Sequence, residues 1–249
     1  MRKRGNKLKI AALTQKGTDK KENEDRIIIG KTILVNGIYS YNGDVNIIAI
    51  ADGVGGNNAG AVASHYVANC IGELSVADKE KFSNINNRLI DMSKKDITLN
   101  NMATTLSGIF FEGNIVKTFH IGNTRVYLLQ GERYLKQITQ DDTTLNYLVK
   151  TGQIAKDEAN TFQQKNEINA CFGGGDTALF NMKIAILSDS SVATFLLTSD
   201  GIHECVSIDE LEDIFKTSET DIEICEKIAN NAVAYGSSDD LSVLVVRIK

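Results

Sequence analysis

The spacing of the apolar segments constrains the fold of this chain more than any other feature. Strand-like runs rich in Ile, Val, Leu and Thr occur in clusters, and connections as short as 112–114 and 131–132 separate neighbouring runs. Such short connections close antiparallel hairpins, whereas parallel strands need long crossovers. The chain is therefore expected to form antiparallel sheets in an α+β arrangement, not a doubly wound parallel sheet.

Apolar alternation and β-branched runs predict strands at Leu8–Thr14, Arg26–Val35, Val45–Ala51, Thr104–Phe111, Ile115–Ile121, Arg125–Gln130, Arg133–Ile138, Phe180–Ile186, Val192–Thr198 and Leu241–Ile248. Helical periodicity predicts helices at Ala59–Gly72, Lys79–Lys95, Thr143–Thr151, Lys156–Gln164, Ile208–Lys216 and Asp221–Tyr235. No repeat or linker divides the chain, so residues 1–249 are expected to form one domain. The polar segment 141–177, which ends in three glycines, is expected to be a lid inserted in that domain.

Charge and composition narrow the class of protein. The net charge of -5 argues against nucleic-acid binding, which needs a positive face. The apolar run Ile10–Leu13 is too short for a signal peptide, and no other run approaches the length of a membrane span. We therefore expect a cytoplasmic protein whose four cysteines, none in a CxxC pair, are reduced. The chain has no proline, so glycine and asparagine must supply its turns.

Short acidic motifs stand next to four predicted strands. Glu24-Asp25 precedes one strand and Asp239-Asp240 precedes the last, while Asp52-Gly53 and Asp200-Gly201 each follow a strand. One such motif alone is an ordinary turn or helix cap. Carboxylates gathered in one site repel each other unless cations lie between them, and an all-oxygen set suits Mg²⁺ or Mn²⁺ better than zinc.

Other kinds of site are less well supported by the residues. The glycine-rich stretch 51–60 follows a strand and opens a helix, but it does not keep the GxGxxG spacing of a dinucleotide site. The chain also lacks a strong Ser/His/Asp or Cys/Arg nucleophile pattern. His65, His120 and His203 are expected to be core or surface residues of helices and strands.

The acidic motifs belong to a longer ordered set. The set comprises Asn23-Glu-Asp25, Ala51-Asp-Gly-Val-Gly-Gly56, Ala103-Thr-Thr-Leu106, His120-Ile-Gly-Asn-Thr-Arg125, Ser199-Asp-Gly-Ile202 and Ser238-Asp-Asp-Leu-Ser242. In identity, order and spacing these motifs resemble those of the metal-dependent protein phosphatases, the PPM or protein phosphatase 2C-like family. The second motif is similar to that of bacterial members that partner Ser/Thr kinases. The resemblance covers the chain from about Lys7 to Lys249.

The resemblance implies a four-layer α-β-β-α sandwich with a two-metal centre between its sheets. It implies that Asp52 bridges two Mn²⁺ or Mg²⁺ ions, that the Gly53 carbonyl completes the first, and that Asp200 and Asp239 hold the second. Glu24 and Asp25 are expected in the inner or water-mediated shell, so that Asp52, Asp25 and Glu24 form the catalytic set. Two close ions lower the pKa of a shared water, which supplies the hydroxide that attacks phosphorus.

Four positions depart from the family pattern. Lys20, with Lys21 beside it, replaces the arginine that binds phosphate, so a point charge replaces a bidentate fork. Asn123 replaces an aspartate, which puts a third metal site in doubt. Asp240 replaces the asparagine of the last motif, and Val54 replaces a histidine that donates a proton in some members.

The sequence therefore predicts a protein serine/threonine phosphatase that acts on phosphorylated proteins as a monomer and opposes a Ser/Thr kinase. Lys20 is its expected phosphate-binding residue, and the lid is its expected source of substrate choice. Two alternatives remain open: a catalytically weak or inactive phosphoprotein-binding regulatory module on the same fold, and a small-molecule phosphohydrolase or nucleotide-binding protein.

Overall fold

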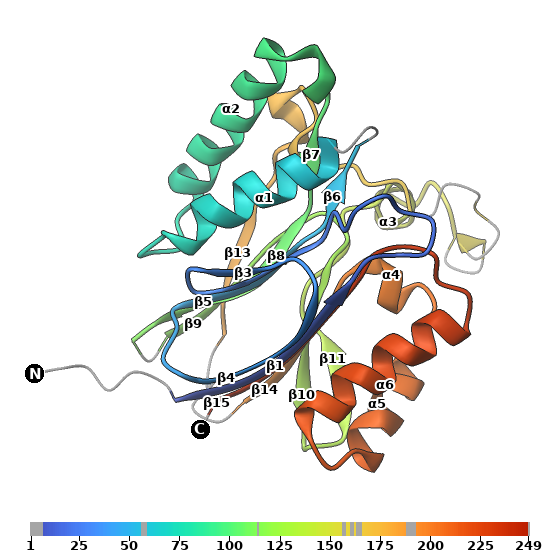
Figure 1. Ribbon diagram of the computed structural model, residues 1–249. Coiled ribbons are helices and arrows are strands. Elements are labelled where there is room, and N and C mark those ends of the chain that lie inside the picture. The colour runs from blue at the N-terminus through green and yellow to red at the C-terminus, as the bar shows by residue number, and fades with distance from the viewer. Residues whose placement is uncertain are drawn as a thin grey trace, which may run out of the picture.

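The computed structural model describes residues 7–55, 59–113, 115–155, 158–159, 162, 166–187 and 193–248. Their strands form two six-stranded sheets and a small three-stranded one, and the pairings between these strands are antiparallel (Figure 1). The predicted α+β class is confirmed.

The first sheet has the order β11 (Tyr134–Gln137), β10 (Arg125–Gln130), β14 (Thr194–Thr198), β15 (Leu241–Ile248), β1 (Leu8–Gln15) and β4 (Gly37–Gly43). The second has the order β13 (Lys183–Leu187), β9 (Ile115–Ile121), β8 (Leu106–Glu112), β5 (Ile47–Ala51), β2 (Arg26–Ile29) and β3 (Thr32–Leu34). The small sheet has the order β12 (Phe172–Gly173), β7 (Ala103–Thr104) and β6 (Gly53–Val54).

Helices cover the outer face of each large sheet, which confirms the four layers (Figure 1). The second sheet is covered by α1 (Ala59–Gly72) and α2 (Lys79–Lys95), and the first by α4 (Asp200–His203), α5 (Ile208–Thr217) and α6 (Asp221–Ala234). The helix α3 (Thr144–Lys150) and the 3-10 turns η1 (Ile97–Leu99) and η3 (Thr177–Leu179) complete the set of described helices.

The layers explain why the central strands read as continuous apolar runs. All five residues of β5 are buried. Ile47 and Ala49 pack toward α1 and α2, whereas Ile48 and Ile50 pack against the other sheet. Alternate residues therefore enter two different cores, and each buried Ile contributes about 1.5–3 kcal/mol to stability.

Some elements differ from the sequence predictions. The predicted strand Arg26–Val35 is a hairpin of β2 and β3, because Gly30 takes a left-handed φ of 58° between them. β4 was not predicted, since it is an edge strand with mostly exposed or half-buried residues and no clear apolar pattern. β13 begins at Lys183, after η3, and β14 begins at Thr194. The predicted helix 156–164 lies mostly outside the described residues.

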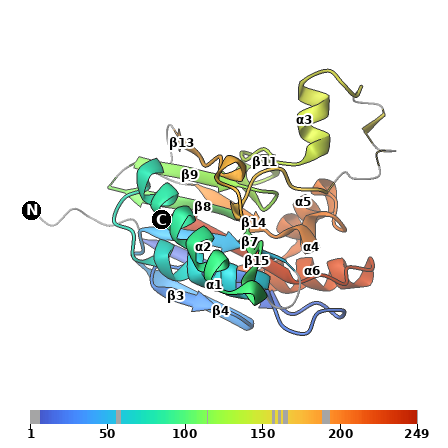
Figure 2. The same ribbon diagram turned by 90° about the horizontal axis from the view of Figure 1, so that it is seen from above.

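The segment 141–177 follows β11 of the first sheet and leads, through β12, toward β13 of the second sheet. Figure 2 shows α3 beyond the end of the large sheets. The returning chain pairs at the isolated bridge between Thr143 and Ile168, and again at β12, which joins β7 in the small sheet. Among the helices that the structure describes, none combines the length and apolar character needed to cross a bilayer.

Candidate active site

The strand register brings the acidic motifs to one edge of the sandwich. Arg26 pairs with Ala51, so Asp25 and Asp52 stand side by side at the end of the second sheet. In the first sheet β14 ends at Thr198, next to the start of β15, so Asp200 and Asp239 occupy the corresponding edge. Residues from both sheets thus meet there.

A cleft of about 390 Å³ opens at this edge. It is lined by Lys20, Glu24, Asp52, Gly53, Val54, Gly55, Asn123, Asn166, Glu167, Ile168, Asp200 and Asp239. The structure therefore brings together every predicted site residue except Asp25 as lining of one cleft. Asp25 lies beneath it and is only 1% exposed.

The carboxyl groups of the cleft strongly oppose each other's ionisation. Burial, and then the nearby charge of Asp200, raises the pKa of Asp52 well above its ordinary value. Burial likewise raises the pKa of Asp200, with Asp239 adding to the effect. Asp52 and Asp200 lie within hydrogen-bonding reach of each other. A proton or another cation has to stand between such groups.

Asp25 is the most constrained member of the group. Burial raises its pKa to about 8, although the Ser242 and Ser199 hydroxyls nearby act in the opposite direction. Neither carboxyl oxygen accepts a hydrogen bond of ordinary geometry from the described residues. A buried carboxyl without well-formed hydrogen bonds is costly, and it is a common mark of a functional site.

These residues suit a hard divalent ion in their chemistry, because they offer only oxygen atoms and a buried carboxyl that lacks well-formed hydrogen bonds. In the part of the chain that the structure describes, no three Asp, Glu, His or Cys side chains are already arranged so that they could hold a metal ion together. The oxygen ligands for a metal ion are therefore present, but they are not yet arranged around one ion position.

Lys20 supplies a cation inside this acidic cleft. Its Nζ lies 2.9 Å from Asp239 Oδ1 and 3.4 Å from Glu24 Oε2. Burial lowers the pKa of Lys20, but the hydrogen bond and charge of Asp239, together with the charge of Glu24, outweigh burial and raise it. The residue predicted to bind phosphate is thus paired with two of the predicted acidic residues.

Close backbone packing positions Asp52 and Gly53. A Cβ on Gly53 would lie 2.3 Å from the Gly60 carbonyl oxygen, so only glycine lets the start of α1 approach this loop. The Asp52 carbonyl accepts hydrogen bonds of 2.8 Å from the Thr105 N–H and the Thr104 hydroxyl. The motif at 103–106 therefore fixes the backbone that carries Asp52.

Asp240 has a role that the sequence reasoning missed. Its Oδ1 accepts a hydrogen bond of 2.8 Å from the Gly17 N–H, and its Oδ2 accepts one of 2.7 Å from the Glu24 N–H. The carboxylate therefore ties the loop that carries Lys20 and Glu24 to the loop before β15. Its place beside Asp239 was the only signal in the sequence.

Asn123 points one end of its amide at the acidic group. Its Nδ2 donates a hydrogen bond of 2.9 Å to Asp200 Oδ2. Its Oδ1 is buried and has no hydrogen-bond partner among the described residues. An aspartate here would place another negative charge beside Asp200.

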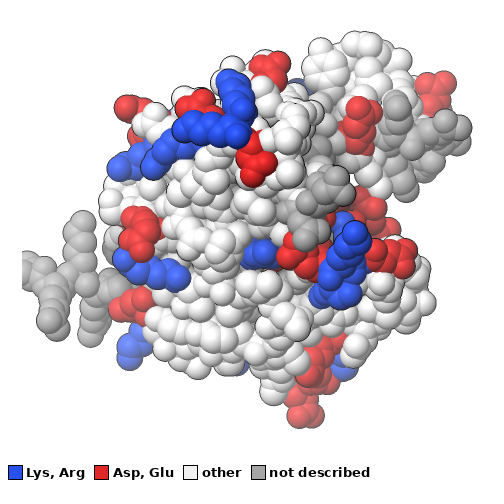
Figure 3. Space-filling model, turned by 45° about the horizontal axis from the view of Figure 1, so that its top comes forward, with Lys and Arg blue, Asp and Glu red and all other residues white. Residues whose placement is uncertain are grey.

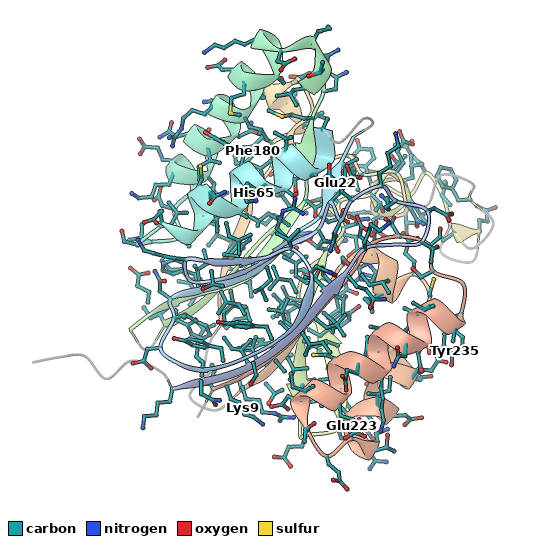
Figure 4. All side chains as sticks on the ribbon, viewed as in Figure 1. Lys9, Glu22, His65, Phe180, Glu223 and Tyr235 are labelled. Carbon is teal, nitrogen blue, oxygen red and sulfur yellow. The ribbon has the colours of Figure 1, made fainter. Side chains whose placement is uncertain are left out.

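The three histidines lie where structural roles were predicted. His120 is buried, with Nδ1 2.7 Å from the Ser107 hydroxyl and Nε2 2.8 Å from the Gln140 carbonyl oxygen. His203 Nδ1 lies 2.8 Å from the Thr198 hydroxyl, and burial lowers its pKa well below the ordinary value. His65 is exposed on the outer helix α1 (Figure 4).

Comparison with known proteins agrees with this geometry. The family model described as Protein phosphatase 2C matches residues 37–243. Protein phosphatase PhpP of Streptococcus pneumoniae is 31% identical over 96% of this chain and 97% of its own length. The chain belongs to the protein phosphatase 2C family, and it is accordingly a phosphatase enzyme.

Solved structures show the same fold. The Mycobacterium tuberculosis serine/threonine phosphatase PstP/Ppp superposes with a TM-score of 0.79 at 27% identity, covering 98% of this chain and 99% of the other. The catalytic domain of PstP in complex with two manganese ions gives a TM-score of 0.77 at 27% identity, covering 97% and 98%. The predicted family and fold are confirmed.

Proposed function

We propose that the chain is a metal-dependent protein phosphatase that hydrolyses phosphoserine and phosphothreonine with two Mn²⁺ or Mg²⁺ ions. One observation carries the proposal: carboxyl groups from both sheets meet in one cleft, and the one beneath it, Asp25, accepts no hydrogen bond of ordinary geometry from the described residues. The two manganese ions of the similar PstP domain support the same conclusion.

Asp52, the Gly53 carbonyl, Asp200 and Asp239 would hold the ions, with Glu24 and Asp25 in the inner or water-mediated shell. Bound ions of this kind supply a nucleophilic water at neutral pH and neutralise phosphate charge. Asn123 contributes an amide where a third ion would need a carboxylate, so we propose two ions.

The other residues of the cleft bind and orient the substrate. Lys20 would bind the phosphoryl oxygens as a point charge. Val54 lies on the cleft wall and offers no proton, and the ring nitrogens of His120 are hydrogen-bonded within the body of the protein. The leaving oxygen would therefore take its proton from solvent in the cleft.

The proposed substrates and the opposing kinase are inferred from the similar proteins. Similar proteins are serine/threonine phosphatases, so phosphorylated proteins are the proposed substrates and a Ser/Thr kinase the proposed opponent. Acidic and basic side chains are interspersed on the face shown in Figure 3, which fits a protein partner better than nucleic acid.

We propose that the chain acts as one cytoplasmic, monomeric domain. We also propose that segment 141–177 is its lid, because Asn166, Glu167 and Ile168 line the cleft.

Turnover of a phosphothreonine peptide with added Mn²⁺ tests the proposal. Asp52→Asn should reduce turnover about 100-fold or more. Mutation of residues that only hydrogen-bond the metal ligands already costs about 10–100-fold in metal affinity or activity. Asp91→Asn is the matched control, because Asp91 is exposed on α2, away from the cleft. Activity that survives chelation would contradict the metal role, and competition by free nucleotides would favour a small-molecule substrate.

A further inference from the structure

Lys20 links two loops that belong to different sheets. Glu24 lies just before β2 of the second sheet, and Asp239 lies just before β15 of the first. The Lys20 ammonium contacts both, at 3.4 and 2.9 Å. Its side chain is 32% exposed, and that of Glu24 is 12% exposed. The two carboxylates therefore hold a monovalent cation that the chain itself provides.

We propose that Lys20 is a tethered cation that occupies Glu24 and Asp239 in the metal-free protein and is displaced by the divalent ion. The inference rests on the proposed function, because it assigns Asp239 to a metal site. It adds a competition between a side chain and the metal for the same carboxylate.

The geometry allows the side chain to move while its backbone stays in place. The Gly17 N–H is bonded to Asp240, the Asp19 N–H lies 3.4 Å from the Ser238 carbonyl oxygen, and the Lys20 N–H lies 3.4 Å from the Gly17 carbonyl oxygen. A Cβ on Gly17 would lie 2.3 Å from the Ser238 carbonyl oxygen, so this loop is packed tightly against the last motif. Release of Lys20 thus needs only rotation of its side chain.

Lysine suits this role better than arginine. Its ammonium is a compact point charge on a flexible four-carbon stem, whereas the guanidinium fork binds a carboxylate through two parallel hydrogen bonds and leaves it less readily. A released Lys20 remains in the cleft, where its charge is available to the phosphoryl group. Metal loading would therefore prepare the phosphate-binding residue as well as the nucleophile.

Calorimetric titration of the metal-free protein with Mn²⁺ is the first test. Lys20→Met removes the competitor and should tighten Mn²⁺ binding about 3- to 10-fold, as expected from two partly exposed ion pairs. Lys21→Met is the matched control, since Lys21 is an exposed neighbour that makes no ion pair with the described residues. Its affinity should stay within about twofold of the wild type.

Simple repulsion between Lys20 and the ion would also tighten binding in Lys20→Met, so a second measurement is needed. In the wild-type protein an amine-reactive ester should label Lys20 less than Lys21 without metal, because only Lys20 is held by carboxylates. Saturating Mn²⁺ should raise the ratio of Lys20 to Lys21 labelling, read by peptide mass spectrometry. Repulsion without displacement leaves that ratio unchanged.

Equal Mn²⁺ affinity in wild type and Lys20→Met would overturn the inference, and so would a labelling ratio that does not respond to Mn²⁺. Neither result affects the proposed phosphatase activity. A wild-type protein that binds no Mn²⁺ would contradict the proposed function as well. The labelling experiment uses the wild-type chain, so it does not depend on how the variant folds.

Discussion

Two groups of polar side chains lie next to Asn123, and they differ in whether their charges are paired. One is the acidic cleft, formed by Glu24, Asp25, Asp52, Asp200 and Asp239. The other, which we call the paired network, consists of Ser107, His120, Arg125, Asp141, Asp142 and Lys183. Both groups combine residues that are distant in the sequence. They differ in whether their carboxylates face cations or face one another.

In the paired network each carboxylate has a cationic partner. Arg125 binds Asp141 through Nε and Nη2, with the shortest contact at 2.7 Å. Asp142 is bonded to Lys183 and to the Gly122 N–H. These contacts hold the start of segment 141–177, with Asp141 bound to β10 of the first sheet and Asp142 bound to β13 of the second. Pairing here serves the fold.

In the acidic cleft the carboxyl groups face one another, and Lys20 is the one described cation bonded to them. Like charges held together reduce stability unless something from outside neutralises them. Carboxyl groups that the chain leaves without a cationic partner are therefore the ones to assign to catalysis.

The largest expected effect separates activity from stability within the acidic cleft. Asp200→Asn should lower phosphopeptide turnover by about 100-fold or more, because Asp200 is a proposed metal ligand. In chelator the same variant should be more stable by about 1 kcal/mol, which raises Tm by about 2–4 °C, because one repelling charge is gone. Calorimetry in EDTA and a turnover assay with Mn²⁺ measure the two effects. If the variant lost both activity and metal-free stability, the acidic cleft would not differ from the paired network in how its charges affect stability.

The paired network should respond in the opposite way. Arg125→Met leaves Asp141, whose side chain is only 8% exposed, without its cation and should cost about 2–4 kcal/mol of unfolding free energy. Urea denaturation measures the loss. In the double variant Arg125→Met, Asp141→Leu much of the stability should return, because no buried charge is left unpaired. A single variant as stable as the wild type would show that the pair does not support the fold.

The metal-free protein should lose stability as pH rises through neutrality. The folded pKa of Asp25 is about 8, far above its ordinary value, so the folded chain keeps a proton that the unfolded chain has lost. The stability that this proton confers is complete below about pH 4 and is lost as pH rises to about 8.

Histidines act in the opposite direction, but only at lower pH. Burial lowers the pKa of His120 and His203, so their contribution to stability increases with pH and is complete above about pH 6.5. Tm in EDTA should therefore fall between about pH 6.5 and pH 8, where the carboxyl groups act alone. Asp25→Asn should flatten that fall, and an equally steep fall in the variant would exclude Asp25 as its cause.

The smallest effect is expected outside both groups. Lys31 and Glu73 form an ion pair at 2.5 Å, but their side chains are 75% and 65% exposed. Lys31→Met should change the unfolding free energy by less than about 0.5 kcal/mol, because water screens the pair. Urea denaturation provides the measurement. A loss as large as that of Arg125→Met would mean that burial does not distinguish the two kinds of pair.

Much of this fold could be predicted from the sequence, because short connections and apolar runs are local signals. The strand ends at Asp52 and Asp200 were found in the same way, since each closes an apolar run. β4 was missed because an edge strand needs little apolar surface. The partners of Lys20, Asn123 and Asp240 could not be predicted, because each depends on contacts across the fold that leave no periodic pattern in the chain.

One pairing has a consequence for how the protein is made. β1 lies against β15, and the Gly17 N–H reaches Asp240 across 223 positions of the sequence. A ribosome adds about 5–20 residues per second, so β1 waits on the order of 10–45 s for its central neighbour to emerge. The nascent chain meanwhile exposes the apolar β1 and holds only part of its acidic cleft. A newly made phosphatase would thus remain inactive until β15 leaves the ribosome.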